Sequence, residues 1–315
     1  MASSCREGPL SPGPADPSLA SMLGLPTSKR VLIINADDAG LHQASTDAVI
    51  AAFERRLIDS ASAMVPCPGF PSLAAWARQN PDADIGIHLT FVSERPALRF
   101  GPILPPSEVP SLVDSDGHFR RGWPQRRKVD VSEVEAEARA QIEAAIAAGI
   151  SPTHLDSHQH VLQRRGPEVY RALVRVARDY RLPFRRSRKW FGQYPYLADP
   201  AGPLAGPLDD ALSIGRTPVT REDWTRWYVG AVGSLGYGVF ELYVHPAIAT
   251  PELIALMADD PKWGAQWRQD DFDVLASADF GAALMAANVR RIGWRDVMVA
   301  ARRSPTPLAR GQSLG

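Results

Sequence analysis

The chain of 315 residues carries 35 Lys and Arg side chains against 35 Asp and Glu, so its formal net charge is zero. A balanced charge excludes the broad basic field with which proteins bind nucleic acid or an anionic membrane. Two cysteines, Cys5 and Cys67, are too few for a disulfide framework and favour a reducing compartment. No apolar run reaches the roughly 18 residues of a membrane span, and no basic segment leads into an apolar signal sequence, so we expect a cytoplasmic protein.

Both ends of the chain and two internal segments lack periodicity. Residues 1–28 and 303–315 are rich in Ser, Pro and Gly, which predicts disordered tails on either side of a single domain, 29–302. Residues 91–131 and 189–218 are predicted to be long inserted loops, and such loops in a compact domain often carry function. Short arginine runs are predicted to be solvated loop faces rather than a nucleic-acid surface: 120–121, 126–128 and 185–188.

Between the tails, short apolar runs alternate with segments of helical periodicity. Strands are predicted at 31–36, 60–65, 84–89, 153–156, 239–246 and 288–294. Helices are predicted at 46–58, 71–79, 132–149, 167–180, 221–235, 251–258 and 278–287, and the third of these opens on Ser132-x-x-Glu135, the pattern of a capping box. About seven such units predict an α/β fold in which helices cover a parallel sheet that closes, or nearly closes, into a (β/α) barrel.

Acidic and imidazole side chains stand at the ends of four predicted strands. The first strand, VLIINADD, ends in two adjacent carboxylates, and the other three end in GIHLT, THLDSHQH and YVHPA. The carboxyl ends of parallel strands open at one common mouth, so these side chains are expected to converge there. The candidate residues are Asp37, Asp38, His88, His154, Asp156, His158, His160 and His245.

One carboxylate and two neutral imidazoles form a suitable site for a divalent metal ion. The charge of the metal would relieve the repulsion between the two aspartates, and the other aspartate could act as a base toward a water whose pKa the metal lowers. Spacing alone ranks neither Asp37 against Asp38 nor His158 against His160. Taken singly, the aspartates could cap the following helix, and His88 could be a satisfied core histidine.

The set NADDAG, GIHLT, THLDSHQH and ELYVHPA, in this order, resembles the YdjC/ChbG family of carbohydrate deacetylases over roughly residues 30 to 300. The resemblance implies a distorted (β/α) barrel, one divalent metal ion and removal of the N-acetyl group from an amino sugar or short oligosaccharide. It implies that Asp38, His88 and His158 are the metal ligands, that Asp37 is the catalytic base and that His245 is the general acid. It also implies a homodimer.

The remaining candidates surround this implied centre. His154 and Asp156 match family positions near the metal, and His160 is the histidine that the spacing left open. Trp190 and Tyr194, in the second long loop, could stack on sugar rings or could merely pack that loop on the barrel. One carboxylate and two imidazoles suit Zn²⁺ or another transition ion better than Mg²⁺.

Two other functions remain open at this stage. The first is a metal hydrolase that acts on another amide or on a phosphate ester, which the arginines at 185–188 would favour. The second is a sugar-binding homologue without activity, which an intact pair of aspartates and an intact His245 disfavour.

Overall fold

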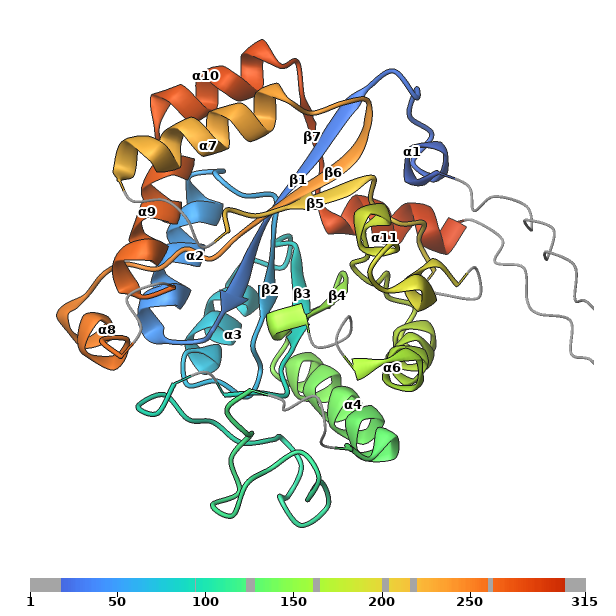
Figure 1. Ribbon diagram of the computed structural model, residues 1–315, viewed down its shortest axis with the longest axis vertical. Coiled ribbons are helices and arrows are strands. Elements are labelled where there is room, and N and C mark those ends of the chain that lie inside the picture. Colours follow the sequence, from blue (N-terminus) through green and yellow to red (C-terminus); the bar gives the residue numbers. More distant parts are fainter. Residues whose placement is uncertain are drawn as a thin grey trace, which may run out of the picture.

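The computed structural model describes residues 18–93, 95–122, 128–160, 165–199, 204–215, 220–259 and 263–303. They form a curled, wholly parallel sheet with helices packed around its outer face (Figure 1). The strand order is β4-β3-β2-β1-β6-β5, and β7 pairs with the start of β1. The strands are β1 (Arg30–Ala39), β2 (Ser60–Ala63), β3 (Ile85–Leu89), β4 (Leu155–Ser157), β5 (Asp210–Leu212), β6 (Gly238–Val244) and β7 (Arg290–Arg291).

Helices follow the strands in βα order, as the alternating pattern predicts. The α-helices are α1 (Leu19–Met22), α2 (Gln43–Glu54), α3 (Phe70–Gln79), α4 (Val131–Ala147), α6 (Pro167–Asp179), α7 (Arg221–Gly233), α8 (Pro251–Leu256), α9 (Ala265–Leu275), α10 (Ala278–Ala286) and α11 (Trp294–Arg303). Three short 3₁₀ turns lie at η1 (His158–His160), η2 (Arg188–Trp190) and η3 (Pro195–Ala198). In the described ranges, no helix combines the length and apolarity needed to cross a bilayer.

The sheet is closed by a segment that is not itself a regular strand. Residues 183–188 pass between the two edge strands: the Arg185 amide donates to Leu155 O of β4 at 2.9 Å, and the Leu208 amide, just before β5, donates to Arg186 O at 2.9 Å. Hydrogen bonding between backbones therefore continues around the barrel. The predicted distorted (β/α) barrel is confirmed, and its distortion lies at this segment.

The inside of the barrel is layered because side chains alternate along each strand. On β1, Leu32 and Ile34 face the outer core under the helices, whereas Val31 and Ile33 join an inner apolar cluster with Trp294. Further along the inner face, the interior becomes polar at Asn35 and Asp37, which are also buried. The barrel thus has an apolar floor and a polar upper layer that leads to its mouth.

Part of the predicted N-terminal tail helps to build that floor. Residues 1–17 and 304–315 lie outside the described residues, but α1 forms within 18–28 and contacts α11 and β6 (Figure 1). Leu19 is 1% exposed and packs with Val31, Val239 and Trp294. The prediction of a disordered tail was wrong for α1, because one helical turn is too short to show periodicity among neighbours rich in Ser, Pro and Gly.

The local predictions failed where the periodic signal was weak or misread. Helix α4 is capped by Asp130, whose side chain accepts from the Ser132 amide, so the predicted Ser132 capping box does not form. The predicted strand at 288–294 shrinks to β7, because Trp294, Val297, Met298 and Ala301 follow the helical spacing of α11. Helix α9 was not predicted, since its buried face includes Arg268 and Asp271.

Replacing Leu19 with Ala should lower the free energy of unfolding by about 2–5 kcal/mol, because a buried side chain is lost from the barrel floor. Urea unfolding followed by circular dichroism measures this loss. Ile254→Ala is the control, since Ile254 is 52% exposed and should change stability little. Equal stabilities for the Leu19→Ala protein and the parent would show that α1 is not part of the folded unit.

Candidate active site

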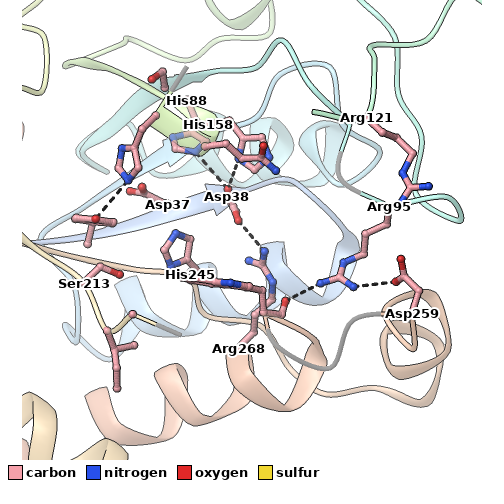
Figure 2. Close-up of a pocket in the computed structure, with 17 residues that line it drawn as sticks. Asp37, Asp38, His88, Arg95, Arg121, His158, Ser213, His245, Asp259 and Arg268 are labelled. Carbon is pink, nitrogen blue, oxygen red and sulfur yellow. Dashed lines mark hydrogen bonds and ion pairs between the residues drawn. The ribbon is translucent and has the colours of Figure 1, made fainter. Parts of the chain in front are cut away.

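A cavity of about 670 Å³ opens at the carboxyl ends of the strands (Figure 2). It collects side chains from the ends of β1, β3, β4 and β6, together with residues of the long loop after β3 and of α9. The lining residues are Asp37, Asp38, His88, Arg95, Arg121, Ser157, His158, Gln159, His160, Ser213, Ile214, Gly215, Tyr243, His245, Asp259, Trp263 and Arg268.

A bulge in β1 lets two adjacent carboxylates reach the same cavity. Successive side chains of a regular strand point to opposite faces. The register between β1 and β2 slips between Ala36 and Ala39, and Asp38 has the left-handed φ of 60°. A non-glycine residue in this region is strained, and such strain gathers at functional sites. The bulge therefore explains how Asp37 and Asp38 both line the mouth.

Asp38 lies within reach of two imidazoles. Its Oδ1 is 3.3 Å from His88 Nε2 and 3.0 Å from His158 Nδ1, and all three residues are at most 2% exposed. Their ligand atoms lie within 4.8 Å of one another, so the group could hold a metal ion. These are the three residues for which the resemblance implies metal binding, and Figure 2 shows them facing one another.

Asp156 fixes the orientation of His88 from the side opposite Asp38. Its Oδ1 lies 2.8 Å from His88 Nδ1, while Ser62 Oγ lies 3.2 Å from the same nitrogen. A proton on Nδ1 that is donated to Asp156 leaves the Nε2 lone pair directed at the Asp38 group, which is the usual support for a metal-bound histidine. Burial alone would lower the pKa of His88, but the carboxylates of Asp156, Asp37 and Asp38 raise it well above its ordinary value.

The two aspartates of the bulge have different partners. Arg185 binds Asp37 with both ends of its guanidinium, NH1 to Oδ2 and NH2 to Oδ1, each at 2.7 Å. Arg268 instead lies 2.8 Å from Asp38 Oδ2. Burial raises the pKa of Asp37, but Arg185 and His88 together outweigh that effect and leave the pKa below its ordinary value.

Arg185 was predicted to lie on a solvated loop face, and this prediction was wrong. Both Arg185 and Arg186 are 3% exposed, because the segment 183–188 closes the barrel. Inside, Arg185 also lies 2.9 Å from Asp156 Oδ2 and 2.8 Å from Glu241 Oε2. One guanidinium therefore joins three buried carboxylates.

Glu241 carries this network down to the barrel floor. It accepts a hydrogen bond from Trp294 Nε1 at 2.9 Å and is fully buried. Burial raises its pKa to about 7, although Arg185 opposes the rise. A single acidic residue inside the apolar strand VFELYV was a signal that sequence reasoning missed.

The charges around the mouth leave a deficit of positive charge. Four carboxylates and two guanidiniums are all at most 4% exposed: Asp37, Asp38, Asp156, Glu241, Arg185 and Arg268. Carboxylates therefore outnumber guanidiniums around the mouth, and a divalent cation held by neutral imidazoles would lessen this excess of negative charge. A second group of Asp37, His88 and Asp156 also lies close together, but Arg185 already binds both of its carboxylates.

His245 approaches from the other wall of the cavity, at the end of β6 (Figure 2). Its ring lies against Trp267 and Trp263, at centroid distances of 5.4 and 5.9 Å. Its amide donates to Asp271 Oδ2 at 2.8 Å, whereas its Nδ1 is 4.0 Å from that oxygen. Burial lowers the pKa of His245, and the carboxylates of Asp38 and Asp37 partly oppose this.

The other predicted residues lie around this centre. His154 is buried below the mouth and stacks on Trp294 at 4.8 Å, and Asp156 is the partner of His88 described above. His160 lines the cavity and contacts Tyr243 and Trp190. Trp190 and Tyr194 do not line the cavity and pack beside a small cluster around Tyr170. Whether Trp190 or Tyr194 stacks on a sugar stays a prediction.

Buried carboxylates and imidazoles at the mouth of a parallel barrel define a class of site that could hold a divalent metal ion. The profile of YdjC-like proteins matches residues 31–286. A carbohydrate deacetylase of Thermus thermophilus is 32% identical over 287 residues, which is 89% of this chain and 97% of the relative. The chain belongs to the YdjC-like family.

Other relatives match over shorter stretches. Carbohydrate deacetylases of Brevibacillus brevis and Geobacillus stearothermophilus are 34% and 33% identical, and the match covers 53% and 50% of this chain but only 60% of each relative. A crystal structure from Enterococcus faecalis V583, described as that of a candidate cellobiose-phosphate cleavage protein, superposes with a TM-score of 0.70 and 28% identity. That superposition covers 86% of this chain and 99% of the other.

Replacing Arg185 with Ala should destabilise the protein by about 3–5 kcal/mol, because three buried carboxylates lose their shared cation. Urea unfolding measures this change. Arg188→Ala is the matched control: the side chain is 41% exposed and its nearest carboxylate is 3.6 Å away, so it should cost less than about 1 kcal/mol. Equal effects of the two substitutions would contradict the central role of Arg185.

Burial makes stability depend on the pH through His154. Its pKa falls from 6.5 to about 3 in the folded protein, so only the unfolded chain takes up a proton between these values. Stability from this residue is fully present above pH 6.5 and is lost as the pH falls toward 3, by on the order of 4 kcal/mol. His154→Phe keeps a ring against Trp294 and should flatten the decline, as measured by urea unfolding between pH 7.5 and 4.5. An unchanged slope would rule out His154 as its source.

Proposed function

We propose that this protein is a metal-dependent hydrolase that removes the N-acetyl group from an amino sugar or short N-acetylated oligosaccharide. The proposal rests on the different partners of the two adjacent aspartates. Asp38 contacts the imidazoles of His88 and His158, whereas Asp37 accepts hydrogen bonds from the guanidinium of Arg185. A ligand group next to a separate carboxylate base is the arrangement that metal-assisted amide hydrolysis needs. The deacetylase names of the relatives support the choice of an acetamide.

Asp38, His88 and His158 are the residues that would hold the metal ion. When bound, a divalent ion supplies a Lewis acid that polarises the acetamide carbonyl and makes a water more acidic. Two nitrogens and one oxygen favour Zn²⁺ or another transition ion over Mg²⁺. Asp156 and Ser62, both on His88 Nδ1, would orient this ligand set.

Asp37 is the proposed base. The two hydrogen bonds from Arg185 hold its carboxylate in one orientation and keep it ionised, so it is ready to accept the proton of the attacking water. Asn35 Nδ2 donates to Asp37 Oδ1 at 2.8 Å and adds a third constraint. Loss of the negative charge at this position would remove the base while leaving Asp38 in place.

His245 is the proposed acid on the opposite wall. An amine leaves an acylated carbon poorly unless its nitrogen is protonated, so an acid is required beside the leaving group. The protonated imidazole, which the carboxylates of Asp38 and Asp37 favour against the effect of burial, donates this proton as the C–N bond breaks. The products are acetate and the free amino sugar: Asp37 takes one proton from the water, the remaining hydroxide bonds to the acyl carbon, and His245 gives a proton to the leaving nitrogen. Asp37 then releases its proton to solvent and His245 takes one up, so that both residues return to their starting states.

Asp37→Asn should reduce acetate release by a factor of about 10² or more while the bound metal stays, because only the base is lost. Asp38→Asn should lose both the metal and the activity. Both are measured on a panel of N-acetylated sugars, from N-acetylglucosamine to short chito-oligosaccharides, with metal content determined for each protein. Asp47→Asn removes an exposed carboxylate of α2 and is the control.

The same panel separates the alternatives. Phosphate release from a phosphate ester without acetate release from any sugar would favour the rival hydrolase. Sugar binding without turnover in the metal-loaded protein would favour a binding protein. Full activity in Asp37→Asn would refute the assignment of the base.

A further inference from the structure

The guanidinium of Arg95 forms hydrogen bonds between the loop after β3 and the segment between α8 and α9. Arg95 belongs to the long loop after β3, yet it reaches the segment between α8 and α9 (Figure 2). There it donates to Met257 O at 3.3 Å, to Asp259 Oδ1 at 2.9 Å and to Trp263 O at 3.2 Å. Arg95 itself is only 4% exposed, and its bond to Met257 O is buried, whereas the Asp259 side chain is 39% exposed.

Trp263 lines the cavity, and its backbone carbonyl accepts the hydrogen bond from Arg95. Its φ of 64° is unusual for so large a side chain, and the bond from Arg95 helps to hold that conformation. Its ring packs on Trp267 at a centroid distance of 4.3 Å and lies 5.9 Å from His245. A partly exposed indole therefore stands in the cavity wall beside the proposed acid.

Among the described residues that line the cavity, Trp263 and Tyr243 are the aromatic side chains other than histidine. The guanidinium of Arg185 lies over the ring of Tyr243 at 5.2 Å, and the ring of His160 also packs against Tyr243. The Tyr243 ring therefore already contacts polar side chains of the site. Trp263 has the flat apolar surface that matches the C–H face of a pyranose ring.

We infer that Trp263 is a sugar-stacking residue that sets the affinity for the substrate, and that Arg95 is its positioning residue. The inference rests on the proposed function, because it assumes that the cavity takes a sugar. The sugar that carries the acetamide would lie between Asp38 and His245, and the Trp263 ring lines the cavity 5.9 Å from the His245 ring. It thus fills the role for which Trp190 and Tyr194 were candidates.

Trp263→Leu keeps an apolar side chain but removes the flat surface, so it should raise KM for N,N′-diacetylchitobiose by about tenfold with little change in kcat. Trp263→Phe should recover most of the loss. Tyr237→Leu is the control, because its ring is 66% exposed, lies against Arg30 and does not line the cavity, so KM should not change. A fall in kcat alone, or an equal effect of Tyr237→Leu, would overturn the inference.

The role of Arg95 is tested in a double-mutant cycle. Arg95→Lys keeps the charge but cannot make the three forked contacts, so it should also raise KM. If Arg95 acts through Trp263, Arg95→Lys should have almost no further effect on KM in the Trp263→Leu protein. Additive effects would show that Arg95 does not act by positioning Trp263.

A binding measurement that needs no catalysis tests the role of Trp263 separately from the proposed deacetylase activity. Calorimetry measures the Kd of N,N′-diacetylchitobiose for the Asp37→Asn protein with and without Trp263→Leu. A roughly tenfold loss of affinity supports stacking even if the parent protein releases no acetate. Unchanged affinity in a protein that does release acetate overturns the inference alone, and no binding by either protein overturns it together with the sugar cavity.

Discussion

The ion pairs of Arg185 are the constraint on which the rest of the site depends. A guanidinium that is 3% exposed joins Asp37, Asp156 and Glu241, which come from three different strands. Without that cation, these buried carboxylates would lose the positive charge that favours their ionised forms. The segment that carries Arg185 also closes the barrel between β4 and β5, so closure of the fold and charge balance of the site depend on the same few residues.

Much of the site could be predicted because parallel strands end at one edge. Asp38, His88 and His158 lie at the ends of three separate strands, and knowing where the strands end was enough to predict that they share one mouth. The choice of Asp38 over Asp37 and of His158 over His160 came from the family resemblance. Arg185 could not be placed in this way, since the segment 183–188 has isolated bridges in place of a regular strand and its sequence is rich in charge. Periodicity reports a buried strand only when the strand is apolar, and here the buried side chains are arginines.

The aromatic residues show a different limit. Trp190 and Tyr194 stood out because they lie in an aromatic-rich stretch, but that stretch packs on Tyr170 as a small core of its own. Trp263 stands among charged residues, where nothing in the sequence distinguishes it. Its place at the cavity depends on Arg95, which is distant in sequence, and on a left-handed backbone that spacing does not reveal.

The paired aspartates now have a physical explanation that neither residue provides alone. The bulge in β1 places both carboxylates at the mouth, and two different guanidiniums then distinguish them: Arg185 binds Asp37 through both oxygens, while Arg268 lies 2.8 Å from Oδ2 of Asp38. Oδ1 of Asp38 is left to the two imidazoles, where a lone pair can still serve a cation. The geometry therefore separates a carboxylate that is held for proton transfer from one that can bind a metal, although the two are adjacent in the chain.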